Sequence, residues 1–358
     1  MQAYLSPEGN YAELDRYLSG FRRVFLVCGS SFCLLTPGKH LQTLEERGEV
    51  RLVRFSGFSP NPCREEVNAG IAGFQTSECG LIVAAGGGSA MDTAKCIRHS
   101  VGRGTPLLAI PTTAGSGSEA THFAVVYRNG IKESVDCGLP DAVMLDPSTL
   151  ETLPDYQRKA TMLDALCHAV ESFWSVNATP DSMDYSERAL EQIMRSYQGY
   201  LCNTPEGNAG MLRAAHTAGK AINIARTTAG HAMCYQLTKL YGLAHGHAAA
   251  LCVAVLWPYL LTHLDQCTHP LGRMRLGHIL ERIARAMGCS NARAGAECFQ
   301  SILNSLGLKV PAPSEEELAA LTAGVNAERL NNFPVVLCER EIQRLYREIL
   351  SRGLNHGN

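Results

Sequence analysis

The sequence predicts an α/β N-terminal domain built on a parallel sheet, followed by an all-α C-terminal domain. Over the first 150 residues, short and continuously apolar runs alternate with helical patterns, which is typical of a parallel sheet covered by helices. Further along, long segments with helical periodicity replace the apolar runs. The chain has 358 residues, enough for two hydrophobic cores. We expect the domains to cover residues 1–152 and 153–358.

Five apolar runs predict the strands of the parallel sheet, at residues 24–28, 50–55, 81–85, 107–110 and 142–145. Because these runs are continuously apolar rather than alternating, both of their faces should be buried. The C-terminal half predicts helices at residues 184–199, 207–225, 273–286, 292–306, 314–323 and 339–352. One of them opens with Ser314 and has Glu317 three residues later, the pattern of a capping box.

Composition excludes several classes of function. Lys and Arg total 32 against 34 Asp and Glu, and no basic block suggests a nucleic-acid partner. The most apolar stretch, residues 248–261, is interrupted by Pro258 and is shorter than the roughly 20 residues of a membrane span. The N-terminus lacks the pattern of an export signal, and the 14 cysteines form no C-x-x-C pair. We expect a soluble cytoplasmic protein with a small-molecule partner.

A glycine-rich turn joins the run at 81–85 to a helical pattern. It reads Gly86-Gly87-Gly88-Ser89, with Asp92 in the helix that follows. Glycines let the backbone approach a phosphate, and the helix N-terminus offers free N–H groups and a partial positive charge. The turn departs from G-x-G-x-x-G because Met91 replaces the third glycine. It predicts nucleotide binding, and the alternative is a tight strand-to-helix turn.

A second turn rich in hydroxyls and glycine follows the next predicted strand. It contains Thr112, Thr113 and Ser116, whose hydroxyls suit phosphate or ribose. Two such turns at the carboxyl ends of neighbouring strands lie where open α/β sheets bind ligands. The two turns together therefore favour one nucleotide site.

Candidate metal ligands are spread over the second half. Asp164 and His168 lie four residues apart in a helical segment and hence on one face, although such a pair is often only structural. His231, His245 and His247 stand near glycines in apolar surroundings, where an unpaired imidazole is unfavourable. One carboxylate and several imidazoles suit Fe²⁺ or Zn²⁺ with positions left for a substrate oxygen. From the residues alone, either His245 or His247 could be the ligand.

These motifs identify a family resemblance. GGGSAMDTAK, PTTAGSGSEAT, the Asp164/His168 pair, and His231 with His245 fourteen residues later resemble the iron-containing (group III) alcohol dehydrogenases over nearly the whole chain. The resemblance implies a cleft between the two domains, where metal faces nicotinamide, and a homodimer. It implies Fe²⁺, or alternatively Zn²⁺, on Asp164, His168, His231 and His245. The implied cofactor residues are Gly87, Gly88, Ser89, Asp92, Thr112, Thr113, Ser116 and, near the ribose, Lys132.

Two positions depart from the family pattern. Tyr235 stands where many members carry a second histidine near the substrate, and a phenol titrates near pH 10. Any proton relay must therefore differ or run through His247 or water, which leaves His231, His245, Tyr235 and His247 as the catalytic candidates. After the first predicted strand, Gly29 and Ser30 replace the acidic residue of NAD-selecting members. Nothing there repels a 2′-phosphate, so we expect NADPH to be preferred over NADH.

Arg226 suggests the substrate. It lies five residues before His231, and with Asn223, Thr227 and Thr228 it forms a donor set suited to a tetrahedral oxyanion. The alternative is a buried ion pair with Glu171. The stretch ARTTAGHAMCY also resembles the branch of the family that reduces phosphonoacetaldehyde to 2-hydroxyethylphosphonate. The resemblance implies a metal-dependent aldehyde reductase, with sulfoacetaldehyde and uncharged short aldehydes as alternative substrates.

Two other functions are compatible with the sequence. A metal lyase similar to the dehydroquinate synthases would use NAD transiently, so net formation of NAD(P)H from an added alcohol would separate it from a dehydrogenase. A nucleotide-binding redox sensor built on the many cysteines would show thiol-dependent partner binding and no turnover.

Overall fold

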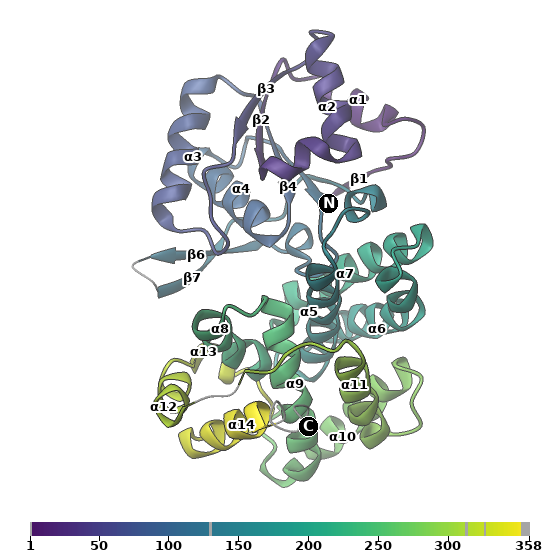
Figure 1. The fold of residues 1–358 in the computed structure, drawn as a ribbon, viewed down its shortest axis with the longest axis vertical. Coiled ribbons are helices and arrows are strands. Elements are labelled where there is room, and N and C mark those ends of the chain that lie inside the picture. The colour runs from purple at the N-terminus through teal and green to yellow at the C-terminus, as the bar shows by residue number, and fades with distance from the viewer. Residues whose placement is uncertain (1, 129–130, 312–313, 326, 352–358) are drawn as a thin grey trace.

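The structure, a computed structural model, describes residues 2–128, 131–311, 314–325 and 327–351. An α/β part lies above a helical part in Figure 1. The α/β part is built on a six-stranded sheet in the order β1-β8-β5-β4-β2-β3, and neighbouring strands pair in parallel. Its strands are β1 (Ala3–Leu5), β2 (Arg23–Cys28), β3 (Arg51–Phe55), β4 (Leu81–Gly86), β5 (Leu107–Pro111) and β8 (Ala142–Met144). All five predicted strands are confirmed, and β1 is additional.

Helices cover both faces of the sheet, which explains the continuously apolar runs. Leu81 and Val83 of β4 pack into one buried cluster, whereas Ile82 and Ala84 pack into the cluster on the opposite face. The first cluster includes residues of α1 (Ala12–Leu18) and α2 (Thr36–Glu46), and the second includes residues of α3 (Arg64–Ser77) and α4 (Gly88–Val101). Short 3₁₀ turns lie at η1 (Ser30–Leu34), η2 (Ser118–Ala120) and η3 (Pro147–Leu150).

A separate antiparallel hairpin was not predicted. It consists of β6 (Phe123–Arg128) and β7 (Ile131–Asp136), with Tyr127 paired to Lys132. Burial alternates along β6, and Ala124 and Val126 join the buried cluster that contains α4. The hairpin extends to the left above α8 in Figure 1, and Lys132 of β7 lies over the ring of Tyr235 in α8.

The C-terminal half is helical, as predicted. Its helices are α5 (Asp155–Trp174), α6 (Pro180–Leu201), α7 (Pro205–Ala225), α8 (Ala229–Tyr241), α9 (His245–Thr262), α10 (Gly272–Ala286), α11 (Ala292–Ser305), α12 (Glu315–Ala323), α13 (Ala327–Leu330) and α14 (Glu339–Ser351), with a 3₁₀ turn at η4 (Leu264–Gln266). All six predicted helices are present. The capping box is confirmed, because Ser314 Oγ accepts from the Glu317 N–H at 3.2 Å while Glu317 Oε2 accepts from the Ser314 N–H.

Helix α9 lies in the core of the helical part. It is the one described helix long and apolar enough to cross a membrane, and 78% of its 18 residues are buried inside the protein. Trp257 of α9 meets Trp174 of α5 edge-on, with ring centroids 5.7 Å apart. The apolar character of α9 is therefore used for packing within the protein.

The two parts meet closely beside the second glycine-containing turn. Gly117 has a positive φ of 60°. A Cβ added to Gly219 of α7 would lie only 2.9 Å from the Cα of Gly117. The backbones of this turn and of α7 touch because both residues lack a side chain. The α/β and all-α fold class is confirmed, while the domain limits at residue 152 stay a prediction; β8 ends at Met144 and α5 begins at Asp155.

Candidate active site

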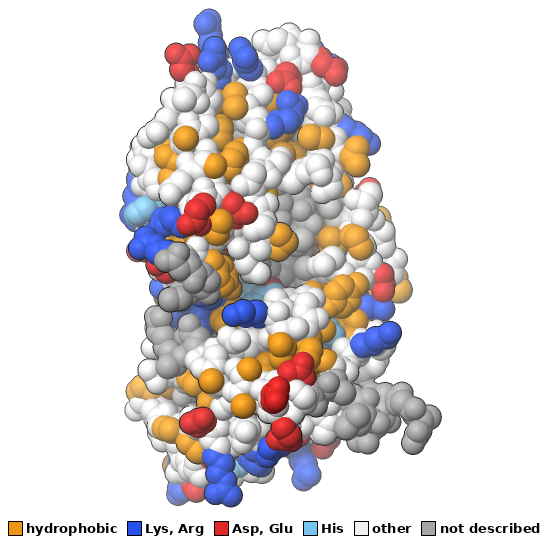
Figure 2. All heavy atoms as spheres, turned by 60° about the vertical axis from the view of Figure 1, so that its left-hand side comes forward, with side chains coloured by type: hydrophobic (Ala, Val, Ile, Leu, Met, Phe, Trp, Pro, Cys, Tyr) orange, Lys and Arg blue, Asp and Glu red, His pale blue; other side chains and the backbone are white. Residues whose placement is uncertain are grey.

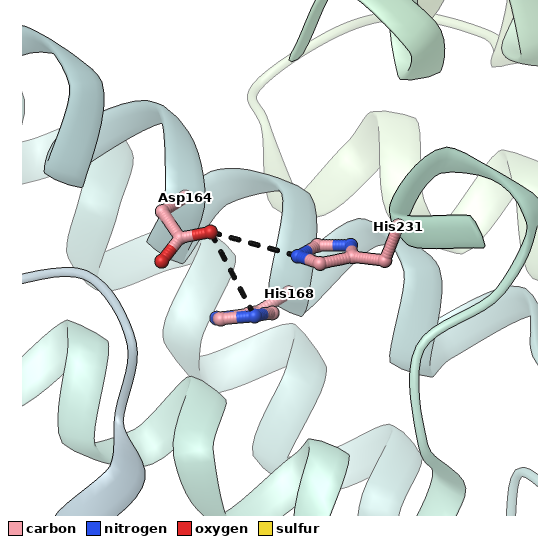
Figure 3. Close-up of side chains that lie close together, drawn as sticks. All are labelled: Asp164, His168 and His231. Atoms are coloured by element: carbon pink, nitrogen blue, oxygen red, sulfur yellow. Dashed lines mark ion pairs between the residues drawn. The ribbon is translucent and has the colours of Figure 1, made fainter. Parts of the chain in front are cut away.

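Asp164, His168 and His231 converge in the interior of the protein (Figure 3). Asp164 and His168 lie one turn apart on α5, and His231 lies in the first turn of α8. The Asp164 Oδ1 atom is 3.5 Å from His231 Nε2 and 3.8 Å from His168 Nε2. Asp164 Oδ1 and His231 Nε2 are buried, and neither has a hydrogen-bond partner among the described residues. Buried oxygen and nitrogen atoms that face one another without hydrogen-bond partners are suitable ligand atoms for a divalent cation.

His245, the first residue of α9, joins this group. Its ring lies 5.1 Å from that of His231 and stacks on Tyr235 at 5.4 Å. His247 lies elsewhere: its Nδ1 is 3.2 Å from the Tyr156 hydroxyl, and it lines a separate cavity of about 380 Å³. The geometry thus favours His245 over His247 as the fourth ligand.

The protonation states suit a metal site. Burial acts to raise the pKa of Asp164, but the surrounding histidines outweigh it and hold that pKa below its ordinary value. Burial lowers the pKa of His168 to about 4 and that of His245 to about 3. At neutral pH the group therefore presents an ionised carboxylate and the neutral imidazoles of His168 and His245, the forms that bind metal. Burial acts to lower the pKa of His231, but the carboxylates of Glu171 and Asp164 favour its charged form and raise that pKa instead.

Glu171 orients His231, a role that the sequence analysis missed. It is fully buried, and its Oε1 accepts from the N–H of Thr228 at 3.0 Å and of Gly230 at 2.9 Å. Its Oε2 accepts the Nδ1–H of His231, so Nε2 is the ring nitrogen directed at Asp164. The signal was available, because Glu171 lies three residues after His168 and so on the same face of α5.

A cavity of about 660 Å³ joins these residues to the glycine-rich turns. Figure 2 shows this side hollowed at mid-height, with pale blue histidine visible between the two parts. Fifteen predicted site residues line the cavity: Gly29, Gly87, Gly88, Ser89, Asp92, Thr112, Thr113, Ser116, Lys132, Asp164, His168, Thr227, His231, Tyr235 and His245. Five others are not among its described lining residues: Ser30, Asn223, Arg226, Thr228 and His247.

The two glycine-containing turns pack against each other at one end of the cavity. A Cβ on Gly87 would lie 3.3 Å from the Thr113 side chain, and one on Gly88 would lie 3.4 Å from Ser116. Asp92 ties this end to neighbouring elements, since Oδ1 accepts from Ser118 Oγ at 2.6 Å and Oδ2 from the Val125 N–H at 3.0 Å. The bare backbone at the start of α4 therefore faces the cavity, as a phosphate site requires.

Arg226 lies outside the cavity, contrary to the expectation that it faces the substrate. It ends α7 with a positive φ of 63°, and its guanidinium contacts the Phe123 ring and His122 Nε2. His122 Nδ1 donates to Asn223 Oδ1 at 2.6 Å, so Nε2 is the acceptor for Arg226. The chain Arg226–His122–Asn223 joins α7 to β6. The alternative ion pair between Arg226 and Glu171 is not present, since the Glu171 carboxylate accepts hydrogen bonds from the start of α8.

The remaining predicted substrate residues divide in the same way. Thr228 is fully buried, and its hydroxyl donates to Glu171 and accepts from Trp174 Nε1 at 3.0 Å. Thr227 lines the cavity, where its hydroxyl accepts from Arg329 Nη1. Arg329 also lines the cavity and was not predicted.

Comparisons with known proteins agree with this geometry. Residues 2–147 match the model of iron-containing alcohol dehydrogenases, and residues 159–350 match the C-terminal model of the Fe-containing alcohol dehydrogenase family. Phosphonoacetaldehyde reductase of Streptomyces viridochromogenes is 32% identical over 246 residues, 60% of this chain and 62% of that protein, which is less than two thirds of its length. Alcohol dehydrogenase 4 of Schizosaccharomyces pombe is 30% identical over 78% of this chain and 69% of its own.

Among solved structures, sulfoacetaldehyde reductase from Bifidobacterium kashiwanohense in complex with NAD⁺ has a TM-score of 0.84 and 25% identity. The match covers 98% of this chain and 97% of that one. Both halves of the chain thus match the same family, and the converging acid and histidines lie where the two halves share a cavity. The chain belongs to the iron-containing alcohol dehydrogenase family and is an enzyme of that type.

Proposed function

We propose that the protein reduces a small aldehyde with NADPH at a divalent metal, and that the aldehyde is phosphonoacetaldehyde, giving 2-hydroxyethylphosphonate. One observation carries the proposal: the unpaired Asp164 Oδ1 and His231 Nε2 face a cavity whose other end is formed by the glycine-rich turns. A hydride donor bound at the turns and a carbonyl held near the acid and histidines share that cavity.

Asp164, His168, His231 and His245 would hold the cation, with Fe²⁺ the favoured ion and Zn²⁺ the alternative. When bound, it supplies Lewis acidity to a carbonyl oxygen, while nicotinamide supplies the hydride. Glu171 keeps His231 in the tautomer that presents Nε2.

A water molecule in the open cavity would donate the proton that converts the reduced aldehyde to the alcohol. Burial raises the pKa of Tyr235, so its hydroxyl stays protonated, and it lines the cavity beside His245. His247, the other candidate for a relay, faces Tyr156 in a different cavity. Tyr235 therefore remains neutral and can donate a hydrogen bond within the cavity.

The choice of substrate and cofactor rests on two further observations. The relative that reduces phosphonoacetaldehyde is 32% identical, although over only part of its length. Gly29 lines the cavity, and no heavy atom lies within 4 Å of where its Cβ would be, so a 2′-phosphate has room there. We further propose that the protein is cytoplasmic, which its free cysteines fit. We also propose that it is a homodimer, which sedimentation of the purified protein would test.

The test is a steady-state assay of protein reconstituted with Fe²⁺ or Zn²⁺, using NADPH and NADH with phosphonoacetaldehyde, sulfoacetaldehyde and propionaldehyde. We expect the highest kcat/KM with phosphonoacetaldehyde and NADPH, and stoichiometric oxidation of the cofactor. Preference for sulfoacetaldehyde would replace the substrate but retain the chemistry. Turnover of an added polyol phosphate without net change in NAD(P)H would overturn the reductase in favour of a lyase.

A further inference from the structure

The hairpin β6–β7 is anchored to both parts of the molecule at its open end. In the α/β part, the Val125 N–H donates to Asp92 of α4 at 3.0 Å. In the helical part, Arg226 at the end of α7 lies over the Phe123 ring, with its Cζ 4.4 Å from the ring centroid. These contacts fix the hairpin where β6 begins. Lys132 lies nearer the turn of the hairpin, which these contacts do not reach.

Near its turn, the hairpin meets α8 through Lys132 and Tyr235. The Lys132 Nζ lies 3.3 Å from the centroid of the Tyr235 ring, which places the ammonium over the face of the ring. Both residues line the cavity. The same ring stacks on His245, with centroids 5.4 Å apart and an angle of 18° between the planes. One tyrosine ring thus contacts a lysine of the α/β part and a candidate metal ligand of the helical part.

A neutral aromatic ring is a suitable partner for this lysine. Lys132 forms no ion pair with a carboxylate among the residues that the structure describes. Burial lowers its pKa well below the usual range, whereas the negative face of an aromatic ring favours the charged form. Burial also raises the pKa of the Tyr235 hydroxyl, so the ring stays uncharged. The ring face therefore stabilises the ammonium where burial opposes its charge.

A histidine at position 235 would serve this contact less well. Its imidazole ring is smaller than a phenol ring, and once protonated it repels an ammonium. A tyrosine offers a larger aromatic face that stays neutral over the whole working range of pH. The contact between Lys132 and Tyr235 therefore follows from the residue by which this chain departs from the family pattern.

We propose that Tyr235 is a positioning residue: the face of its ring holds the Lys132 ammonium in the cavity and fixes the hairpin β6–β7 against α8. The hydroxyl is not needed for this role. The contact joins the two parts of the molecule beside the cavity in which cofactor and aldehyde would meet. The inference rests on the proposed function for its effect on NADPH, because a fixed ammonium adds positive charge to a cavity that an anionic cofactor enters.

Hydrogen–deuterium exchange of residues 123–128 and 132–136 tests the contact directly in the metal-loaded protein without cofactor. Tyr235→Leu removes the ring and should speed exchange of the hairpin on the order of 3- to 30-fold, the range expected for loss of one cation–π contact. Tyr235→Phe keeps the ring and should match wild type, and Tyr235→His should fall between the two. Tyr185→Leu on α6, whose ring contacts Arg188, is the matched control and should leave the hairpin unchanged.

A double-mutant cycle with Lys132→Met gives a second readout, the dissociation constant of NADPH measured by fluorescence titration. Tyr235→Leu and Lys132→Met should each weaken NADPH binding by about the same factor. The double variant should bind no more weakly than Lys132→Met alone, because both changes remove one contact. A residue that only supports the fold would show additive effects instead.

Three results would overturn the inference: additive effects in the cycle, unchanged exchange of the hairpin in Tyr235→Leu, or equal defects in Tyr235→Phe and Tyr235→Leu. The last would assign the role to the hydroxyl. Tyr235→His replaces the leucine variant if that variant does not fold. If wild type reduces none of the aldehydes, the proposed function fails, and the exchange measurement still decides whether the ring holds the hairpin.

Discussion

Two buried carboxylates on α5 differ in what surrounds them, and this difference separates their roles. Asp164 leaves Oδ1 without a described partner, whereas Glu171 has hydrogen bonds to both oxygens. An unpaired buried oxygen is available to a cation, while a saturated one fixes the groups around it. Asp164 therefore suits a ligand, and Glu171 a positioning residue for His231.

Replacing Glu171 should weaken the metal site without removing a ligand. Glu171→Gln keeps the shape but loses the charge that holds the His231 tautomer, so metal affinity should fall on the order of 10- to 100-fold. Competition with a chromophoric chelator measures this. The exposed Glu206→Gln on α7 is the control. Unchanged affinity would show that Glu171 only packs.

The choice between His245 and His247 is testable by paired substitutions. His245→Ala should remove most bound metal and nearly all turnover while nucleotide binding persists, because the glycine-rich turns lie on other elements. His247→Ala should retain metal, since His247 lies against Tyr156. Metal analysis and NADPH titration of both variants give the answer, and full metal in His245→Ala would sink the assignment.

At the scale of elements, we propose that the loop after β2 governs the choice between NADPH and NADH. Gly29 has an extended backbone with φ of −74° and open space at its Cβ, so Gly29→Asp should fold normally. Its carboxylate would repel the 2′-phosphate of NADPH, and the kcat/KM ratio should swing toward NADH. Equal use of both cofactors by the variant would show that position 29 does not discriminate.

The start of α9 is pressed against α5, and this packing sets the position of His245. A Cβ on Gly246 would lie 2.0 Å from the Ala160 carbonyl oxygen and 2.5 Å from Asp164 Cβ. Gly246→Ala should therefore lower the free energy of unfolding by about 1–3 kcal/mol and weaken metal binding. Urea denaturation measures this against Gly277→Ala on α10, where nothing lies within 4 Å and no destabilisation is expected.

The elements show what the sequence could and could not predict. Strands such as β4 were predictable because burial on both faces leaves a continuous apolar run. The β6–β7 hairpin was not, since alternation over Ile131–Asp136 is weak and its charged residues resemble a loop. The sequence could not predict where the Arg226 side chain points, because a position five residues before His231 does not determine the direction of a side chain. Its positive φ turns the chain at the end of α7, and its side chain goes to His122.

At the scale of the whole molecule, the proposed metal ligands lie on helices that pack together. Asp164 and His168 come from α5, His231 from α8 and His245 from α9, and all three helices contribute to one buried cluster. The fold does not depend on the cation to bring these helices together. The site is therefore largely formed before metal enters.

Removing the metal should accordingly leave the protein folded but less stable. At a free metal concentration of about 100 times Kd, binding adds roughly 2.7 kcal/mol, which chelation would withdraw. Melting curves should shift down on chelation and recover on adding Fe²⁺ or Zn²⁺. His245→Ala should show no such shift. Complete unfolding on chelation would contradict a preformed site.

The hairpin β6–β7 and the short helix α13 have a consequence for how this enzyme can change over generations. Lys132 and Arg329, two residues of the cavity lining, come from these segments, whereas Asp164, His231 and Glu171 lie within the packed helices. Substitutions in a buried polar network usually disturb a fold strongly. Changes in the two segments can therefore reshape the cavity over generations while the acid and the histidines are retained.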